Sequence, residues 1–353
     1  MIDRGNAPSL SGIGIHTDGL IYYLCRYGKN RINISESTAS SISYKYRALR
    51  RIIYLGKLRR LSYKNYNDAD VVHFTNIYLP QRHKKIPFIS TIHDLDPLTD
   101  DFAHSRSYRI YYSNIVKKAI HRARFILTPT EYVRSQIIDR YPGSEQYVRA
   151  IGHGISSQFI NTADSMADEQ QFDIPTLLCV GTLTLKKNTK WLISTVVHGV
   201  RTGALPPLRL ILAGRRGFGF SEIEQVIKES PEIVEWVESP DINHLVKLYK
   251  GSHVVVLPSL KEGFGLTLVE AMYCKKCIVA SRIPTSVEVA SDAALFFDLD
   301  DIESFYNAIN SAFVDGDKSN RLKRIEQRVK LYMWENLIPE YINTYEQAVQ
   351  SST

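Results

Sequence analysis

SLKEGFGLTLVEA, at residues 259–271, reads as a loop, a tight turn and the start of a helix. The apolar run HVVVL at 253–257 predicts a buried strand before it, and the apolar spacing after Gly265 predicts a helix that packs on a sheet. Gly263 and Gly265 let the backbone approach a ligand closely, and the first N–H groups of a helix attract an anion such as a diphosphate. The stretch therefore predicts an α/β fold with an anion-binding turn.

Two glutamates flank this turn. Glu262 lies in the loop before the helix, and Glu270 lies about one turn inside it. A carboxylate in either place can accept hydrogen bonds from the vicinal hydroxyls of a ribose or a hexose. In the alternative interpretation, Glu262 only complements the helix dipole and Gly-Phe-Gly is only a turn.

The spacing of these glutamates matches a known signature. Residues 262–270 resemble the E-x7-E motif of retaining glycosyltransferases of family 4, and PSLKEGFGLTLVEAM at 258–272 is similar to that family's wording. The resemblance covers residues 9–350. It implies the GT-B architecture, in which two Rossmann-like α/β domains face each other across a cleft and a C-terminal helix crosses back to the N-domain.

The resemblance implies two domains and a returning helix, and the length of the chain agrees with two domains. A chain of 353 residues exceeds what one core usually holds. We expect an acceptor-side N-domain at 1–163, a nucleotide-sugar-binding domain at 172–333 and the returning helix at 334–353. The polar residues 161–171 (NTADSMADEQQ) predict the linker.

Apolar content of 44% and charged content of 23% are ordinary for a globular protein. No apolar run reaches the length of a membrane span and the N-terminus has no signal layout, so we expect a cytoplasmic protein. Four cysteines are too few for a disulfide framework. The pair Cys274 and Cys277 has no second pair beside it, so we predict no metal site.

The net charge of +7 is unevenly distributed, because residues 45–64 contain eight Lys and Arg and no acid. Tyrosines and aliphatic residues separate these cations, a pattern typical of a segment that lies on anionic lipid. Such a segment would place the protein on the inner face of the membrane. A solvated helix face is the alternative. Nucleic acid is not expected, because no nucleic-acid-binding motif is present.

In the first domain, Gly12 and Gly14 resemble the glycine loop that brings the family's first helix to the donor. His93 follows the predicted strand 86–92 and resembles the family histidine that faces the donor sugar. Ligands gather at the carboxyl ends of parallel strands, which suits His93 independently, although a packing role is the alternative. His153 stands where the family commonly has asparagine.

Thr130 predicts the N-cap of a helix at 131–140. Arg134 occupies the arginine place of a family S-x-x-x-R turn, where it would touch an acceptor phosphate or lie on the surface. In the second domain, Lys186-Lys187-Asn188 resembles the family's R-K-N. Two cations at a helix start suit a diphosphate leaving group, and a solvated lysine pair is the alternative.

We therefore expect a retaining glycosyltransferase that needs no metal or cofactor. It would move a sugar, with mannose as our choice and rhamnose as a near alternative, from a nucleotide diphosphate sugar to a glycan or lipid-linked acceptor in bacterial O-antigen or capsule synthesis. The alternatives are an inactive GT-B scaffold subunit and a GT-B sugar epimerase. The predicted catalytic residues are Lys187, Glu262 and His93, and the predicted donor-binding residues are Gly12, Gly14, Lys186, Lys187, Gly263, Phe264, Gly265, Leu266 and Glu270.

Overall fold

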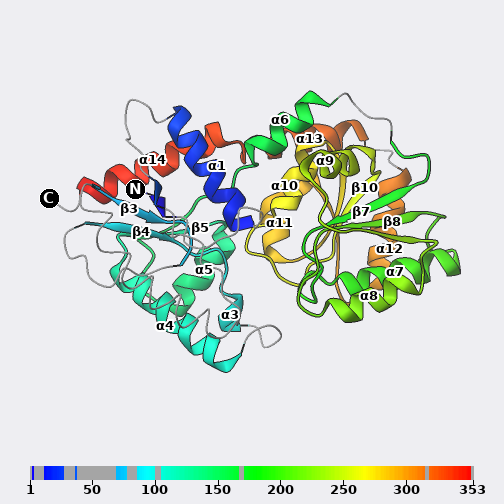
Figure 1. Cartoon of the computed structure of the whole chain (residues 1–353), viewed down its shortest axis with the longest axis horizontal. Helices are drawn as coiled ribbons and strands as arrows, with labels where there is room; N and C mark the ends of the chain where they lie inside the picture. The colour runs from blue at the N-terminus through cyan, green and yellow to red at the C-terminus, as the bar shows by residue number, and fades with distance from the viewer. Residues whose placement is uncertain are drawn as a thin grey trace. The chain divides into compact units, whose positions relative to one another are not determined.

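The computed structural model describes residues 2–3, 12–27, 36–37, 69–77, 86–99, 105–166, 171–314 and 318–350. The chain forms two compact units, each built on a parallel sheet (Figure 1). The first unit comprises Met1–Gly154 and Trp334–Thr353, and the second comprises Ile155–Met333. The basic segment 45–64 lies outside the described residues.

The described strands of the first unit pair in the order β2-β1-β3-β4-β5-β6. Its strands are β1 (Ile2–Asp3), β2 (Glu36–Ser37), β3 (Val72–Phe74), β4 (Phe88–Thr91), β5 (Phe125–Thr128) and β6 (Val148–Ala150), and its helices are α1 (Gly12–Tyr27), α3 (Asp96–Thr99), α4 (Arg106–Arg122), α5 (Glu131–Arg140) and α14 (Trp334–Gln350). The predicted helix 131–140 is confirmed, and the Thr130 hydroxyl caps it by accepting from the Val133 N–H at 3.2 Å.

Alternating side chains of β5 serve two cores in this unit. Phe125 and Leu127 pack with α1 and α14, whereas Ile126 packs with α4 and α5. The alternation is what a strand covered on both faces requires. Trp334, at the start of α14, is fully buried, and a Cβ at Gly19 or Gly154 would come within 2.6 or 2.4 Å of its ring. The returning C-terminal helix is therefore part of the first unit, as the resemblance implied.

The second unit has the strand order β12-β11-β10-β7-β8-β9. Its strands are β7 (Thr176–Val180), β8 (Arg209–Ala213), β9 (Val234–Val237), β10 (Val254–Leu257), β11 (Cys277–Ser281) and β12 (Leu295–Phe297), and its helices are α6 (Ser157–Ser165), α7 (Thr189–Thr202), α8 (Phe220–Lys228), α9 (Ile242–Gly251), α10 (Leu266–Tyr273), α11 (Pro284–Ala290), α12 (Ile302–Val314) and α13 (Lys318–Lys330). The predicted strand before the glutamate motif is confirmed as β10.

The central strand β10 is buried on both faces. Val255 and Leu257 join the core beneath α9, α10 and α13, and Val254 and Val256 join the core beneath α7 and α12. This explains why VVVL at 254–257 is continuously apolar instead of alternating with polar residues. The two helical layers are visible on either side of the sheet in Figure 1.

The predicted linker at 161–171 is wrong in its first half. Residues 157–165 form α6, whose Phe159 and Ala163 are buried in the core of the second unit. Ser156 caps this helix by accepting from the Phe159 N–H at 3.0 Å. The boundary between the units therefore lies at Gly154 and not at the predicted residue 163. The prediction was wrong because α6 has few apolar residues and they are separated by polar ones.

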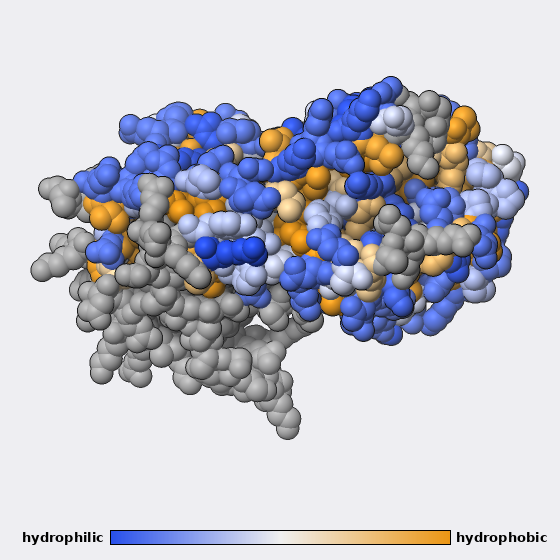
Figure 2. All heavy atoms as spheres, turned by 90° about the horizontal axis from the view of Figure 1, so that it is seen from above, coloured by the Kyte–Doolittle hydropathy of each residue, from blue (hydrophilic) through white to orange (hydrophobic). Residues whose placement is uncertain are grey.

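On the face drawn in Figure 2, the surface of the described residues is mainly hydrophilic and hydrophobic side chains form smaller patches between them. None of the helices in the described part of the chain is long and apolar enough to cross a membrane.

Candidate active site

The predicted turn between β10 and α10 has the geometry that its glycines suggested. Gly265 has φ +92° and forms the N-cap of α10 without a side-chain cap. A positive φ is strained for other residues, so glycine suits this position. The start of α10 therefore presents its positive dipole end without a capping oxygen.

Glu262 is tied to its surroundings by three side chains. The Lys187 ammonium and the Ser259 hydroxyl, the latter at 2.7 Å, both donate to Oε1, and the Thr285 hydroxyl donates to the Glu262 carbonyl at 2.8 Å. Burial opposes the charge of this carboxyl, but Lys187, Lys186 and the Ser259 hydrogen bond hold its pKa below the usual range. No side chain among the described residues donates to Oε2, so this oxygen is available to a ligand hydroxyl.

Lys187 comes from the loop that follows β7. Its N–H donates to the Thr184 hydroxyl at 3.3 Å, and the carbonyl of Lys186 accepts from the Leu260 N–H at 3.0 Å, which joins this loop to the glutamate motif. Asn188 then begins α7 with φ +55°. The lysine pair is thus held beside the glutamate motif, and the Lys187 side chain is only 27% exposed.

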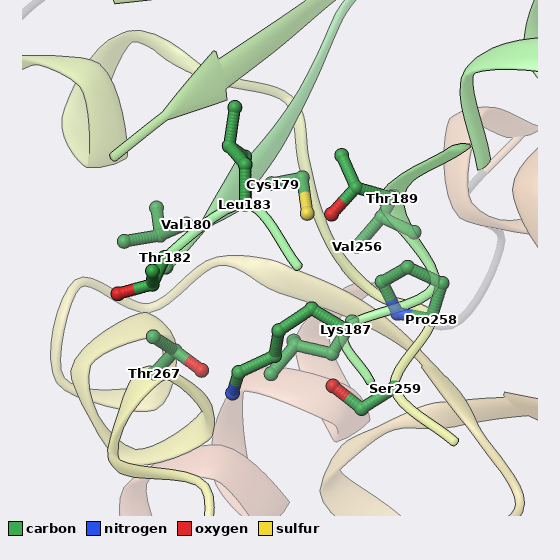
Figure 3. Close-up of a pocket in the computed structure, with 12 residues that line it drawn as sticks. Cys179, Val180, Thr182, Leu183, Lys187, Thr189, Val256, Pro258, Ser259 and Thr267 are labelled. Atoms are coloured by element: carbon green, nitrogen blue, oxygen red, sulfur yellow. The ribbon is translucent and has the colours of Figure 1, made fainter. Parts of the chain in front are cut away.

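A pocket opens where β7 and β10 end, between the two loops. It is lined by Cys179, Val180, Gly181, Thr182, Leu183, Lys187, Thr189, Val256, Leu257, Pro258, Ser259 and Thr267. In Figure 3 the Lys187 side chain extends along the pocket toward Thr267. The hydroxyl oxygens of Thr189 and Thr267 are buried and have no hydrogen-bond partner. Buried hydroxyls of this kind call for a polar partner.

Glu270 lies one turn into α10, as predicted. The hydroxyl of Tyr249 donates to its Oε2 at 2.9 Å. Burial raises the pKa of Glu270 to about 7, although the Tyr249 hydrogen bond and the Lys187 charge lower it. Lys187 therefore acts electrostatically on both glutamates of the motif.

The loop after β8 approaches the same pocket through glycine. A Cβ at Gly214 would lie 1.9 Å from the Gly181 carbonyl, so only glycine fits. Arg215 donates to the Thr182 hydroxyl at 3.4 Å, at the rim of the pocket. Arg216 instead pairs with Glu238 at 3.1 Å.

The side chains of two predicted donor-binding residues, Phe264 and Leu266, pack against the core. Phe264 is 5% exposed, and its ring packs edge to face on Tyr332 at 5.3 Å, so its side chain belongs to the core and only its backbone faces the turn. Leu266 is partly buried against the same core. An aromatic residue between two glycines anchors the turn, a role that the motif alone does not distinguish from ligand stacking.

The remaining predicted residues belong to the first unit. Gly12 and Gly14 lie in the first turn of α1 and not in a loop before it. The hydroxyl of Thr17 on the same helix donates to the Thr75 hydroxyl at 2.9 Å. The Thr75 carbonyl in turn accepts from His93 Nε2 at 2.7 Å, so His93 is connected to the start of α1.

Arg134, predicted to touch an acceptor phosphate or to lie on the surface, has a side chain that is 29% exposed, donates to Glu131 Oε2 at 3.2 Å and also binds backbone. Its Nε donates to the Val148 carbonyl at 2.8 Å and its Nη2 to the Glu145 carbonyl at 3.2 Å. Arg134 therefore supports the loop before β6.

Tyr249, Ser259 and Thr285 are the contacts that sequence reasoning missed. Tyr249 reads as one more apolar position of α9, and Thr285 lies beyond the motif in α11. Only Ser259 could have been identified from the sequence, because it lies within the family-like stretch 258–272, three residues before Glu262.

The comparisons with known proteins identify related glycosyltransferases. Residues 174–315 match the family described as "Glycosyl transferases group 1", and residues 23–159 match "Glycosyltransferase Family 4". The chain is similar to O-antigen chain mannosyltransferase B of Escherichia coli, with 27% identity over 89% of this chain and 85% of the relative. It is also similar to O-antigen chain mannosyltransferase RfbU of Salmonella typhimurium, with 26% identity over 65% of this chain and 63% of the relative.

Two solved structures share the fold. Sucrose-phosphate synthase from Thermosynechococcus elongatus has a TM-score of 0.76 and 20% identity over 99% of each chain. Alr3699/HepE from Anabaena, solved in complex with UDP and glucose, has a TM-score of 0.68 and 15% identity over 98% of each chain. Both likenesses show the GT-B fold.

Proposed function

The chain belongs to the glycosyltransferases whose first domain is of family 4 and whose second is of group 1, and from this premise we propose its reaction. It transfers a hexose, which we take to be mannose, from a nucleoside diphosphate sugar to an acceptor hydroxyl during bacterial surface-polysaccharide synthesis. The O-antigen mannosyltransferases to which it is similar support this choice. Transfer proceeds with retention at the anomeric carbon and without a metal.

The contact between Lys187 and Glu262 carries the proposal. This contact holds the Lys187 ammonium group beside the pocket, and Thr267 from the first turn of α10 also lines that pocket. When the sugar leaves, negative charge grows on the diphosphate, and a fixed ammonium and an uncapped helix start stabilise that charge. Lys186 adds a second cation to the same loop.

Polar groups around the pocket suit the rest of the donor. The buried hydroxyls of Thr189 and Thr267 have unused hydrogen-bonding capacity near Lys187. We assign them to the diphosphate oxygens or to a bridging water. Glu262 Oε2 and the backbone of the turn then bind sugar hydroxyls, and Glu270 binds the ribose.

Retention has two general routes. A double displacement needs a carboxylate nucleophile next to the anomeric carbon. Glu262 is engaged by Lys187 and Ser259, which suits a charge-positioning role better than attack. We therefore favour a same-face reaction in which the leaving phosphate takes the proton of the acceptor hydroxyl.

The acceptor is proposed from chemistry outside the described residues. The basic and aromatic segment 45–64 would bind an anionic membrane surface and bring the enzyme to a lipid-linked glycan on the inner face. The protein is then a peripheral enzyme of the cytoplasmic side.

The test begins with binding. GDP-mannose, UDP-glucose and dTDP-rhamnose are screened for protection against thermal unfolding, because a ligand that binds only the folded state raises its stability. Glu270→Ala serves as the control and should lose protection by the nucleotide sugar and by the free nucleotide alike. Transfer to a glycan acceptor is then followed by proton NMR of the anomeric centre. Binding without transfer would favour a scaffold role, and conversion of the donor to its epimer would favour an epimerase.

A further inference from the structure

The two oxygens of Glu270 have different surroundings. Oε2 accepts the hydroxyl of Tyr249 at 2.9 Å, whereas no side chain of the described residues donates to Oε1. Oε1 is not completely buried, so a ligand hydroxyl can reach it. A carboxylate held in this way can offer one oxygen in a fixed direction.

Tyr249 is itself immobile. It is fully buried on α9, its ring packs edge to face on Phe159 at 5.5 Å, and its carbonyl accepts from the Ser252 hydroxyl at 2.9 Å. A tyrosine whose ring is locked by packing has little freedom to move its hydroxyl. The core of the second unit therefore sets the place of that hydroxyl.

We propose that Tyr249 is a positioning residue for donor binding, which holds Glu270 Oε2 so that Oε1 accepts both hydroxyls of the nucleoside ribose. The inference rests on the proposed function, because it takes a nucleotide sugar as the ligand. Beyond the proposed function, it assigns a role to Tyr249, which touches no substrate, and it predicts that Glu270 releases a proton when the donor binds.

The proton follows from the chemistry of the pair. With Oε2 occupied by Tyr249, a proton on Glu270 resides on Oε1, where it turns an acceptor into a donor. A ribose diol that needs two acceptor sites on Oε1 then binds the ionised form. The titratable groups that face Glu270 are Tyr249 from α9, Lys187 from the loop before α7 and Cys274 at the end of α10.

These neighbours leave Glu270 as the group that titrates near neutrality. Burial raises the pKa of Glu270 to about 7, and it raises the pKa of the Cys274 thiol to about 12. Burial also keeps Tyr249 neutral by raising its pKa well above 10. Donor affinity should therefore rise with pH up to about 7 and then stay constant. Between pH 8 and pH 6 it should fall about tenfold, as the ionised fraction falls.

The decisive variant is Tyr249→Phe, which removes only the hydroxyl. Donor affinity is measured by calorimetry from pH 5.5 to 8.5 with GDP-mannose and UDP-glucose, whose diphosphate diesters do not titrate in this range. In transfer assays at pH 7.5 we expect a severalfold rise in KM and a kcat within about twofold of the wild type. In the calorimetric series we expect the pH midpoint of donor affinity to shift upward, because the lost hydrogen bond favoured the ionised carboxyl of Glu270. Glu270→Gln should give weak binding that does not vary with pH.

The matched control is Tyr273→Phe. Tyr273 is the last residue of α10, and its hydroxyl donates to Asp164 at 2.7 Å in an exposed hydrogen bond, so the loss of that hydroxyl should leave both affinity and midpoint unchanged. If Tyr249→Phe lowers the melting temperature but leaves KM and the midpoint as in the wild type, Tyr249 is only a core residue and the inference is overturned.

A ligand-free measurement separates this inference from the proposed function. Carbon-13 NMR of labelled glutamate follows the titration of Glu270, with Glu270→Gln to assign the signal. An upward shift of the midpoint in Tyr249→Phe supports the coupling even before any donor is added, and an unchanged midpoint contradicts it. If the coupling is present but neither nucleotide sugar binds at any pH, the proposed function fails and the ribose role of Tyr249 fails with it.

Discussion

His153 Nε2 and His93 Nδ1 lie 3.0 Å apart, and this contact determines how both rings carry their protons. His93 Nε2 must bear hydrogen, because its partner at 2.7 Å is the carbonyl of Thr75. In the neutral ring, Nδ1 is then an acceptor, so His153 Nε2 donates to it. Both nitrogens of His93 are thus engaged within the first unit, and a direct catalytic role for His93 stays a prediction.

The first prediction follows from that contact. His153→Leu should destabilise the first unit by about 1–3 kcal/mol, because the buried acceptor on His93 loses its donor. His153→Gln keeps an N–H donor and should cost less in both stability and activity. Unfolding is followed by Trp334 fluorescence in a background with Trp191→Phe and Trp236→Phe. Equal losses in the two variants would mean that the hydrogen bond is not what His153 supplies.

Four histidines of the first unit, His16, His73, His93 and His153, predict that its stability falls in acid. Burial lowers the pKa of His93 to about 4 and that of His73 to about 3, and it keeps the pKa of His16 and His153 well below the ordinary 6.5. Since the unfolded chain takes up these protons first, the stability present above pH 6.5 is lost as the pH falls toward 4. His153→Gln should make this loss shallower by about 1.4 kcal/mol per pH unit.

Lys187 is expected to act on charge that grows during the reaction. Lys187→Ala should lower kcat by about 10²–10³, with a smaller change in donor affinity. The control is Lys190→Ala, since Lys190 is half exposed and pairs with Glu222 at 2.9 Å. Equal losses in kcat and affinity would indicate uniform phosphate binding.

Loss of Lys187 also leaves Glu262 buried without its cation. The double variant Lys187→Ala with Glu262→Gln should recover part of the lost stability but none of the lost turnover, which separates folding from catalysis.

Metal removal tests the electrostatic mechanism directly. Because lysines and a helix start are proposed to balance the diphosphate, excess EDTA should leave the transfer rate unchanged. Inhibition that Mg²⁺ or Mn²⁺ reverses would require a metal-dependent step.

Membrane binding is the prediction for segment 45–64. Each cation near an anionic surface contributes about 1 kcal/mol, and the attraction falls within a Debye length. The protein should co-sediment with anionic but not neutral vesicles, and high salt should release it. Changing Arg50, Arg51, Arg59 and Arg60 to Gln should abolish binding. The control changes four exposed cations of the second unit, Lys190, Arg201, Lys228 and Lys247, and if it weakens binding equally, net charge and not this segment is responsible.

The sequence predicted local features well because their causes are local. The strand before the glutamate motif and the Thr130 cap depend on apolar spacing and capping that a short window contains. The return of the last helix was implied by the family resemblance and not by a local pattern. The α6 helix was mistaken for linker because its apolar residues are few and its polar ones many. Packing between distant segments decided its place.

The site divides in the same way. Lys187 and Glu262 were predicted from motifs far apart in sequence, and the structure brings them into contact. The core position of Phe264 and the Tyr249 contact could not be predicted, because both depend on which side of a helix or turn meets the core. The spacing of apolar residues predicts which face of a helix is buried, but it does not predict which other segment packs on that face.

The burial of Trp334 between Gly19 and Gly154 also has a consequence for biosynthesis. The ribosome releases the residues of α1 before the second unit and those of α14 after it, although both line one core. The second unit is continuous in sequence, so it can complete its core while the core of the first unit still lacks Trp334 and the rest of α14. The half of the protein that is made first is therefore finished last, and a nascent chain stalled before residue 334 would leave the apolar faces of α1 and β5 exposed to chaperones.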